Sequence, residues 1–321
     1  MIKLYRLDSM KYTPFAVNNA KANNFFRQHN IEFTDSASDC DLFITRRNPG
    51  IRKRINLMIK YGDHPILLWT HEPRFNTDFC AQLKSYSILP KFYIMNVYTG
   101  DIHISNYTIY SWAIREKVPL IQKINNSAFL NKTRCIAFLS TYIPQPEKFT
   151  LTKDNRNINL TEIRQNLGIA GYRKGLVDIY GKDWPNGMSV GESRNDNWLD
   201  SKQDILKKYD FNLCLENTNF DYYCTEKIWD SIAGSCLPIY FGKYNRIYET
   251  FPKNSFIDVA DFYPHEDIFN FVENMTEDEY IERLNLCISV YNNLADNRDR
   301  IKYKYQKMLV NIIERINEIL S

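Results

Sequence analysis

Short apolar runs alternate with longer amphipathic stretches through the first third of the chain. The runs lie at 2–6, 41–45, 65–70 and 92–98, and a stretch rich in Lys, Arg, Ile and Leu occupies 50–61. Short apolar strands separated by helical segments are typical of parallel βα units. The first third therefore predicts an α/β domain.

The second half of the chain repeats this alternation. Four further apolar runs have the composition of buried parallel strands, and they are 135–140, 176–181, 211–216 and 236–242. Helical patterns lie at 201–210 and 225–234, and the tail from 275 onward is almost wholly helical, with apolar positions at helical spacing. The polar stretch 141–161 is expected to be a loop.

The pattern predicts an α/β protein of two Rossmann-like domains, with parallel sheets that face each other across a cleft. We expect the first domain at 1–125, the second at 126–295, and a C-terminal helix at 296–321 that packs back on the first. In open α/β sheets ligands bind beyond the carboxyl ends of the strands, and these ends would open into the cleft.

Composition and charge exclude several classes of protein. A net charge of +3 in 321 residues, spread along the chain, gives no basic stripe for nucleic acid. A GxGxxG motif after a strand, expected in a nicotinamide-dependent enzyme, is missing. No apolar stretch is long enough to span a membrane, and charge comes too early for a signal peptide, so we expect a soluble cytoplasmic protein without a transmembrane anchor.

The seven cysteines fit a reducing compartment. Their number is odd and CxxC does not occur, while Cys135, Cys214 and Cys236 lie in or beside apolar runs. We therefore expect buried thiols rather than a disulfide framework or a zinc site.

The richest segment for chemistry is 211–242, which has the pattern strand, loop, helix, strand. Thr225 is expected to cap the helix, with Glu226 and Lys227 in its first turn. A lysine there faces the positive end of the helix dipole. Two interpretations stay open: Lys227 pairs with a nearby acid, or it helps to bind an anion.

This segment resembles the donor-binding signature of the bacterial-type α-1,3/4-fucosyltransferases. The shared features are ENT at 216–218, YxTEK at 223–227, an AG turn and LPIYFG, and they continue into 244–262. The resemblance covers about 130 residues clearly. It implies a GT-B-like fold with GDP-fucose, the donor, held by the second domain and a sugar acceptor held by the first.

The resemblance also implies roles for individual residues. Lys227 corresponds to the lysine that contacts the donor diphosphate, and Glu226 to the acid that holds sugar or ribose hydroxyls. Asn217 and Tyr223 match positions that line the nucleotide site. Cys224 stands where an aliphatic residue is usual, and we interpret it as a packing change.

A second cation and a catalytic base are implied less directly. Arg164 is the better match to the family's donor-binding arginine, and Arg173 is the competing candidate. Glu72, just beyond the apolar run 65–70, matches the family's catalytic base. His71 beside it is a further candidate base, because histidine titrates nearest neutrality.

The expected reaction is inverting, metal-independent transfer of L-fucose from GDP-fucose to O3 of GlcNAc or Glc in an oligosaccharide. Arg164 and Lys227 would neutralise the departing diphosphate without a cofactor or metal. The DxD triplet at 39–41 is interpreted as a polar strand boundary. Two alternatives remain: a different GDP-deoxysugar as donor, or a non-catalytic nucleotide-sugar binder. The sequence leaves the oligomeric state open.

Overall fold

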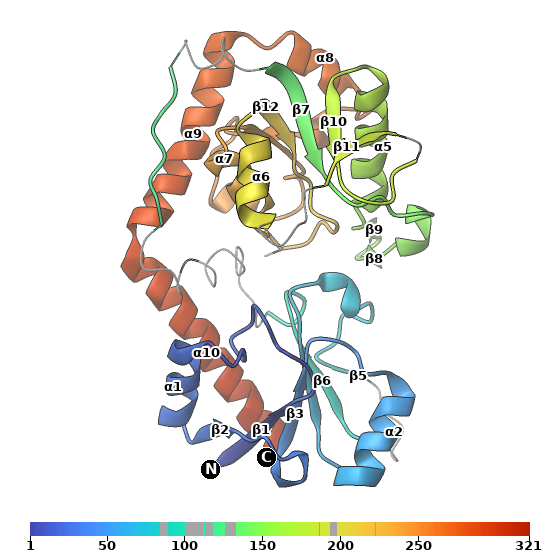
Figure 1. The fold of residues 1–321 in the computed structure, drawn as a ribbon, viewed down its shortest axis with the longest axis vertical. Coiled ribbons are helices and arrows are strands. Elements are labelled where there is room, and N and C mark those ends of the chain that lie inside the picture. Colours follow the sequence, from blue (N-terminus) through green and yellow to red (C-terminus); the bar gives the residue numbers. More distant parts are fainter. Residues whose placement is uncertain are drawn as a thin grey trace. The chain divides into compact units, whose positions relative to one another are not determined.

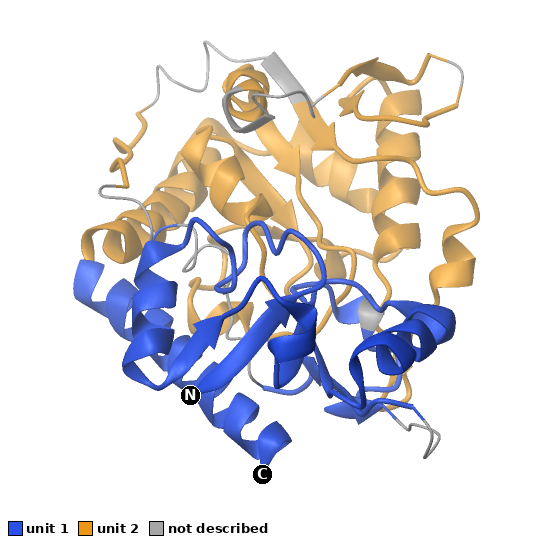
Figure 2. Ribbon diagram, turned by 60° about the horizontal axis from the view of Figure 1, so that its bottom comes forward, with its two compact units in different colours: residues 1–117, 298–321 blue, residues 118–297 orange. Residues whose placement is uncertain are grey.

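The computed structural model describes residues 1–83, 89–100, 112, 118–125, 133–185, 187–192, 198–221 and 223–321. The chain divides into two compact units, one made of 1–117 with 298–321 and the other of 118–297 (Figure 2). The sequence predicts a domain boundary between residues 125 and 126. Residues 126–132, which follow it directly, lie outside the described residues. Each unit is built on its own sheet (Figure 1).

The sheet of the first unit has six described strands in the order β2-β1-β3-β4-β6-β5. Neighbouring strands are parallel except for the pair of β5 and β6. The strands are β1 Ile2–Arg6, β2 Ile31–Phe33, β3 Leu42–Thr45, β4 Ile66–Trp69, β5 Gln82–Leu83 and β6 Phe92–Met95. The helices are α1 Ala20–Gln28, η1 Ala37–Asp39, α2 Gly50–Tyr61, η2 Pro73–Phe75 and α10 Arg298–Leu320.

Helices cover both faces of this sheet, which explains why its strands are continuous apolar runs. All four residues of β4 have no exposed surface. Leu57 of α2 joins a core cluster with Ile66 and Phe92 on one face. On the other, Phe15 stacks on Phe26 of α1 and meets the ring edge of Trp69. The C-terminal helix α10 lies beside α1 (Figure 1).

The second unit contains a fully parallel sheet in the order β11-β10-β7-β12-β13-β14. The strands are β7 Thr133–Leu139, β10 Val177–Tyr180, β11 Ser189–Gly191, β12 Tyr209–Leu213, β13 Leu237–Tyr240 and β14 Ile257–Asp258. The helices are α5 Thr161–Arg173, α6 Trp198–Leu206, α7 Lys227–Ala233, α8 Asp267–Glu273 and α9 Glu277–Asp296, with η4 Ile247–Glu249 and η5 Val259–Asp261 as short turns. The sequence expectation of two parallel-sheet α/β domains is thus confirmed.

Two glycines let α5 pack directly on this sheet. A Cβ atom built on Gly168 would lie 2.4 Å from the ring of Phe138, and one on Gly171 would lie 2.2 Å from Val177. Any larger residue would push the helix off the sheet.

The stretch 141–161 is more ordered than the loop predicted for it. It contains η3 Pro146–Phe149 and a two-stranded hairpin of β8 Thr152–Lys153 and β9 Arg156–Asn157. The prediction failed because two-residue strands in a polar sequence leave no hydrophobic period.

Strand 92–98 was predicted three residues too long. Its hydrogen-bonded part ends at Met95, because the side-chain oxygen of Asn96 accepts the backbone N–H groups of Tyr98 and Thr99 and starts a turn. Among the described residues, the helices lack the length and apolar character needed to cross a membrane.

Candidate functional site

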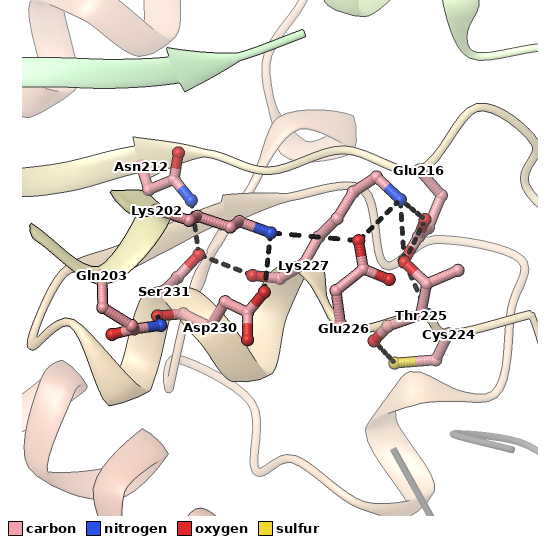
Figure 3. A network of polar contacts seen from close by, with 10 residues as sticks. All are labelled: Lys202, Gln203, Asn212, Glu216, Cys224, Thr225, Glu226, Lys227, Asp230 and Ser231. Carbon is pink, nitrogen blue, oxygen red and sulfur yellow. Dashed lines mark hydrogen bonds and ion pairs between the residues drawn. The ribbon is translucent and has the colours of Figure 1, made fainter. Parts of the chain in front are cut away.

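A cluster of five alternating charges lies where β12 leads into α7 (Figure 3). Its acids and lysines are Glu216, Glu226, Asp230, Lys202 and Lys227. Their side chains are 2–28% exposed, so they interact at low dielectric. The cluster contains Glu226 and Lys227, which the sequence placed at the donor site with Arg164, together with three residues to which the sequence gave no role.

Glu216 is the buried anchor of this charge cluster. Its side chain is 2% exposed, and Oε2 accepts the Nζ of Lys227 at 2.8 Å. Oε1 accepts both the backbone N–H and the hydroxyl of Thr225, each at 2.8 Å. The interpretation in which Lys227 pairs with a nearby acid is therefore realised in this structure, with Glu216 as that acid.

Thr225 does not cap the helix as predicted. α7 begins at Lys227 with Glu226 in the N-cap position, and the Thr225 hydroxyl is turned to Glu216 instead. A capping hydroxyl would accept from the N–H groups of the first turn, whereas here the hydroxyl donates to the buried carboxylate in a charge-assisted hydrogen bond. The Nζ of Lys227 also donates to the Thr225 oxygen at 2.8 Å.

Lys202 links the helices α6 and α7. Its Nζ lies 2.6 Å from Oδ2 of Asp230 and 3.9 Å from Oε1 of Glu226, and its side chain is 12% exposed. The Nζ of Lys227 lies 4.0 Å from the same Glu226 oxygen. The carboxylate of Glu226 is thus flanked by two lysines (Figure 3).

The charges of the cluster separate the pKa values of its two helix acids. Burial opposes ionisation of Glu226, but Lys227 and Lys202 outweigh it and lower the pKa of that carboxyl to about 2. Burial raises the pKa of Asp230 despite the attraction of Lys202. Glu226 is therefore the acid that stays ionised as the pH falls.

Polar contacts to β12 hold the first turn of α7 in place. The Ser231 hydroxyl donates to the backbone oxygen of Lys227 at 2.8 Å, and Asn212 of β12 donates its amide to that hydroxyl at 2.7 Å. Both side chains are buried. The backbone of Lys227 is thereby tied to the central strand of the sheet.

The start of α5 is attached to the loop that follows β12. The N–H of Leu160 donates to the backbone oxygen of Asn217 at 3.0 Å, and the N–H of Asn219 donates to Ile158 at 2.7 Å. Arg164, half-buried, lies in the next turn and bonds back to Leu160 through its N–H. Arg164 and Asn217 are thus brought onto adjoining segments.

Arg173 lies at the opposite end of α5. It is exposed in the last turn, where a cation complements the helix dipole. The helix dipole therefore accounts for an arginine at this position without any contact to the loop after β12. Of the two arginines, Arg164 is thus the one at the end of α5 that adjoins the loop after β12.

Tyr223 and Cys224 lie below the surface of the loop. Tyr223 is 3% exposed and Cys224 2% exposed. Burial raises the pKa of the Cys224 thiol, which keeps it protonated. Cys224 therefore behaves as the packing residue that the sequence suggested.

Glu72 and His71 belong to the first unit, just beyond the carboxyl end of β4. Glu72 is half-buried and precedes η2, and its N–H donates to the hydroxyl of Thr70 at 3.1 Å. The ring of His71 meets that of Trp69 edge to face, with 4.4 Å between centroids. Both residues thus lie at the strand end where the sequence placed them.

The DxD triplet serves the first sheet. The N–H of Lys3 donates to Asp41 at 2.7 Å, and the Nζ of Lys3 pairs with Asp39 at 2.7 Å. Cys40 between them is buried. These contacts confirm the interpretation of the triplet as a polar strand boundary.

A cavity of about 470 Å³ lies along β14 in the second unit. Its lining includes Tyr248, Phe256 and Arg283 but none of the predicted site residues. Its buried charges are satisfied internally: Asp258 accepts three hydrogen bonds, and Arg283 pairs with Glu279 and donates to two backbone oxygens. These groups stabilise the edge of the sheet.

Comparison with known sequences covers the segment that holds the charge cluster. Residues 161–283 match the C-terminal part of glycosyltransferase family 10 (fucosyltransferase). Residues 161–283, called the family 10 domain below, are thus similar to that family. The resemblance expected from the sequence is thereby confirmed, and the family 10 domain contains Arg164, Asn217, Glu226 and Lys227.

Individual relatives of the family 10 domain are distant. The α-(1,3)-fucosyltransferase FucT of Helicobacter pylori is 31% identical over 110 residues, which are 34% of this chain and 22% of that protein. The α-(1,4)-fucosyltransferase of Arabidopsis thaliana is 31% identical over 81 residues, which are 25% of this chain and 20% of that protein. The matched segments thus span about a fifth of these relatives.

Solved structures extend the likeness of fold beyond the family 10 domain. A crystal structure of an α1,3-fucosyltransferase covers 96% of this chain and 90% of its own, with a TM-score of 0.53 and 17% identity. A crystal structure of an α1,3-fucosyltransferase with GDP-fucose gives a TM-score of 0.50 and 18% identity. It also covers 96% of this chain and 90% of its own. The two-unit fold is therefore that of these enzymes.

Three members of the charge cluster were missed in the sequence. Lys202 and Asp230 lie on different helices, 28 positions apart, and each falls on a helix whose charges have the pattern of a solvated face. Glu216 was noted only as part of the ENT motif at 216–218, with no role of its own. Its position directly after an apolar strand was the signal that it would be buried.

Proposed function

We propose that the protein is an inverting fucosyltransferase, which transfers L-fucose from GDP-fucose to a hydroxyl of an oligosaccharide acceptor. The observation that carries this proposal is the family 10 domain with its charge cluster around Lys227 and Glu226. The matched relatives are named as fucosyltransferases, and a solved α1,3-fucosyltransferase of the same fold was crystallised with GDP-fucose, which supports this donor.

The donor diphosphate is bound by Lys227 and Arg164 in this proposal. Lys227 stands on the first turn of α7 with its backbone fixed to β12, and Arg164 stands near the start of α5, which is tied to Asn217. Both segments follow the carboxyl ends of parallel strands, where open α/β sheets bind ligands. Lysine and arginine suit phosphate oxygens as a point charge and a planar fork.

Glu226 holds hydroxyls of the donor sugar or ribose. Its carboxylate stays ionised well below neutral pH, so it accepts hydrogen bonds without competing for a proton. A fixed negative charge there also stabilises the oxocarbenium-like transition state of glycosyl transfer.

Glu72 is the proposed general base. It removes the proton of the acceptor hydroxyl as the oxygen bonds to the anomeric carbon, while the bond from that carbon to the diphosphate breaks and its electron pair leaves with GDP. One displacement inverts the configuration. His71 is the alternative base at the same strand end. The proposed acceptor position is O3 of GlcNAc or Glc.

Metal independence is part of the proposal, because two cations of the family 10 domain are available to neutralise the leaving group. A different GDP-deoxysugar would use the same phosphate contacts, since Lys227 and Arg164 recognise the nucleotide part. A non-catalytic binder would keep these contacts and need no base. A requirement for Glu72 therefore distinguishes an enzyme from a non-catalytic binder.

The test is acceptor-dependent release of GDP with a fucose mass increment in the product, measured in the presence of EDTA. Glu72→Gln is expected to lose turnover while binding GDP-fucose as wild type does, because it alters only the proton acceptor. Lys227→Ala is expected to lose both turnover and GDP-fucose binding, because it removes a phosphate-binding cation. Turnover with another nucleotide sugar alone would overturn the donor assignment, and wild-type binding without turnover on any acceptor would favour the binder.

A further inference from the structure

Lys202 reaches from α6 to two acids at the start of α7 (Figure 3). Its Nζ is 2.6 Å from Asp230 and 3.9 Å from Glu226, and its side chain is 12% exposed. We propose that Lys202 is a positioning residue that keeps the Glu226 carboxylate ionised and in place for the donor. This inference rests on the proposed donor contact of Glu226.

The geometry assigns different tasks to the two contacts of Lys202. The short contact with Asp230 fixes the ammonium, since a charged hydrogen bond of this length is a strong one. The longer contact lets the same charge act on Oε1 of Glu226 without taking up that oxygen. Gln203 next to it donates to the backbone oxygen of Asp230 at 3.3 Å, so neighbouring residues of α6 both hold α7.

Charge balance shows why Glu226 depends on this lysine. Three acids, Glu216, Glu226 and Asp230, share two lysines, and Glu216 takes Lys227 at 2.8 Å. Lys227 lies 4.0 Å from the same Glu226 oxygen and pairs with Glu216, just as Lys202 pairs with Asp230, so Glu226 needs the charge of both lysines. Without Lys202, Glu226 and Asp230 would be two partly buried acids in reach of one distant cation, and a proton would bind to relieve their repulsion.

The directions of the pKa shifts agree with this assignment. Burial alone would raise the pKa of Glu226, yet Lys227 and, to a smaller extent, Lys202 bring it to about 2. Burial raises the pKa of Asp230, so that acid takes up a proton before Glu226 does. Glu226 thereby keeps the charge that a hydroxyl-binding acceptor needs.

The first experiment follows the Glu226 carboxyl carbon by NMR in glutamate-labelled full-length protein, with Glu226→Gln assigning the signal. In wild type the carboxyl is expected to titrate near pH 2. In Lys202→Met it is expected above about pH 4, the ordinary range, while Lys202→Arg restores the low value. Lys207→Met, a change at a lysine 65% exposed, is the matched control and keeps the wild-type titration. An unshifted titration in Lys202→Met overturns the proposal.

The second experiment measures GDP-fucose affinity of the same variants by calorimetry. Compared with wild type, Lys202→Met is expected to lose more affinity at about pH 4 than at about pH 7.5, because a Glu226 carboxyl with an ordinary pKa is largely protonated at the lower pH. A loss of equal size at both pH values would show a merely structural role and overturn the inference. If wild type binds no GDP-fucose, the proposed function fails, whereas the NMR titration still reports whether Lys202 controls Glu226.

Discussion

Lys227 is bound through its Nζ to the buried carboxylate of Glu216 at 2.8 Å, so the proposed phosphate-binding cation is held by an acid beneath it. Because Thr225 also depends on this carboxylate, Glu216→Gln should lower the free energy of unfolding by about 1–3 kcal/mol. It should also weaken GDP binding, since Lys227 loses its anchor. Urea unfolding and calorimetry measure the two effects.

Asp204→Asn is the matched control for Glu216→Gln. Asp204 is 72% exposed and its contact with Lys207 spans 3.8 Å, so its loss should change the unfolding free energy by less than about 0.5 kcal/mol. Equal effects of the two changes would show that Glu216 does not anchor the cluster.

The two arginines of α5 should respond differently to removal. Arg164→Ala is expected to weaken GDP binding by about tenfold or more, because it would lose a charged contact with phosphate. Arg173→Ala should leave GDP affinity within about twofold, since Arg173 is exposed at the far end of the helix. Calorimetric titration with GDP decides between them, and the reverse order would assign the site to Arg173.

The acids Glu226 and Asp230 should give stability–pH profiles of opposite sign. The folded pKa of Glu226 is lowered from 4.5 to about 2, so its contribution to stability is present above pH 4.5 and lost as the pH falls toward 2. The folded pKa of Asp230 is raised above 3.8, so its contribution is present at low pH and lost as the pH rises through the raised value.

The measurement is the unfolding free energy of wild type minus that of Glu226→Gln, and likewise for Asp230→Asn, across the acid range. The first difference should grow as the pH rises, and the second should shrink. Parallel profiles would contradict the arrangement in which the lysines favour Glu226.

Close packing of α5 predicts a large effect of a single methyl group. Gly171→Ala should lower the free energy of unfolding by about 1–3 kcal/mol, because the new atom would meet Val177 and Phe269. Asn166→Ala, at an exposed position of the same helix, is the control and should be neutral or slightly stabilising. Thermal unfolding of the pair checks this, and equal stability would mean that α5 does not lie where the structure has it.

The main strands and helices of the fold could be predicted because buried parallel strands leave continuous apolar runs. The runs 2–6 and 65–70 became β1 and β4, and 50–61 is α2 to the residue. The hairpin of β8 and β9 could not be predicted, since Lys153 and Arg156 contact the rings of Phe220 and Tyr244, far along the chain, and their own pattern is polar.

Residues of the charge cluster were predicted where a local sequence motif contains them. They were missed where their ion-pair partners lie far away along the chain. Glu226 and Lys227 stand side by side in a motif, so the sequence found them. Lys202 acts on them from 24 positions away, and Glu216 becomes important only because the fold buries it. Ion pairs between separate elements follow from packing, which no local pattern specifies.

A crystal structure of the protein with GDP-fucose would test the central claim most directly. The account predicts phosphate oxygens within about 4 Å of the Nζ of Lys227 and the guanidinium of Arg164, with sugar or ribose hydroxyls on Glu226. A nucleotide bound instead in the cavity beside Tyr248 and Phe256, with its phosphates away from both cations, would contradict it.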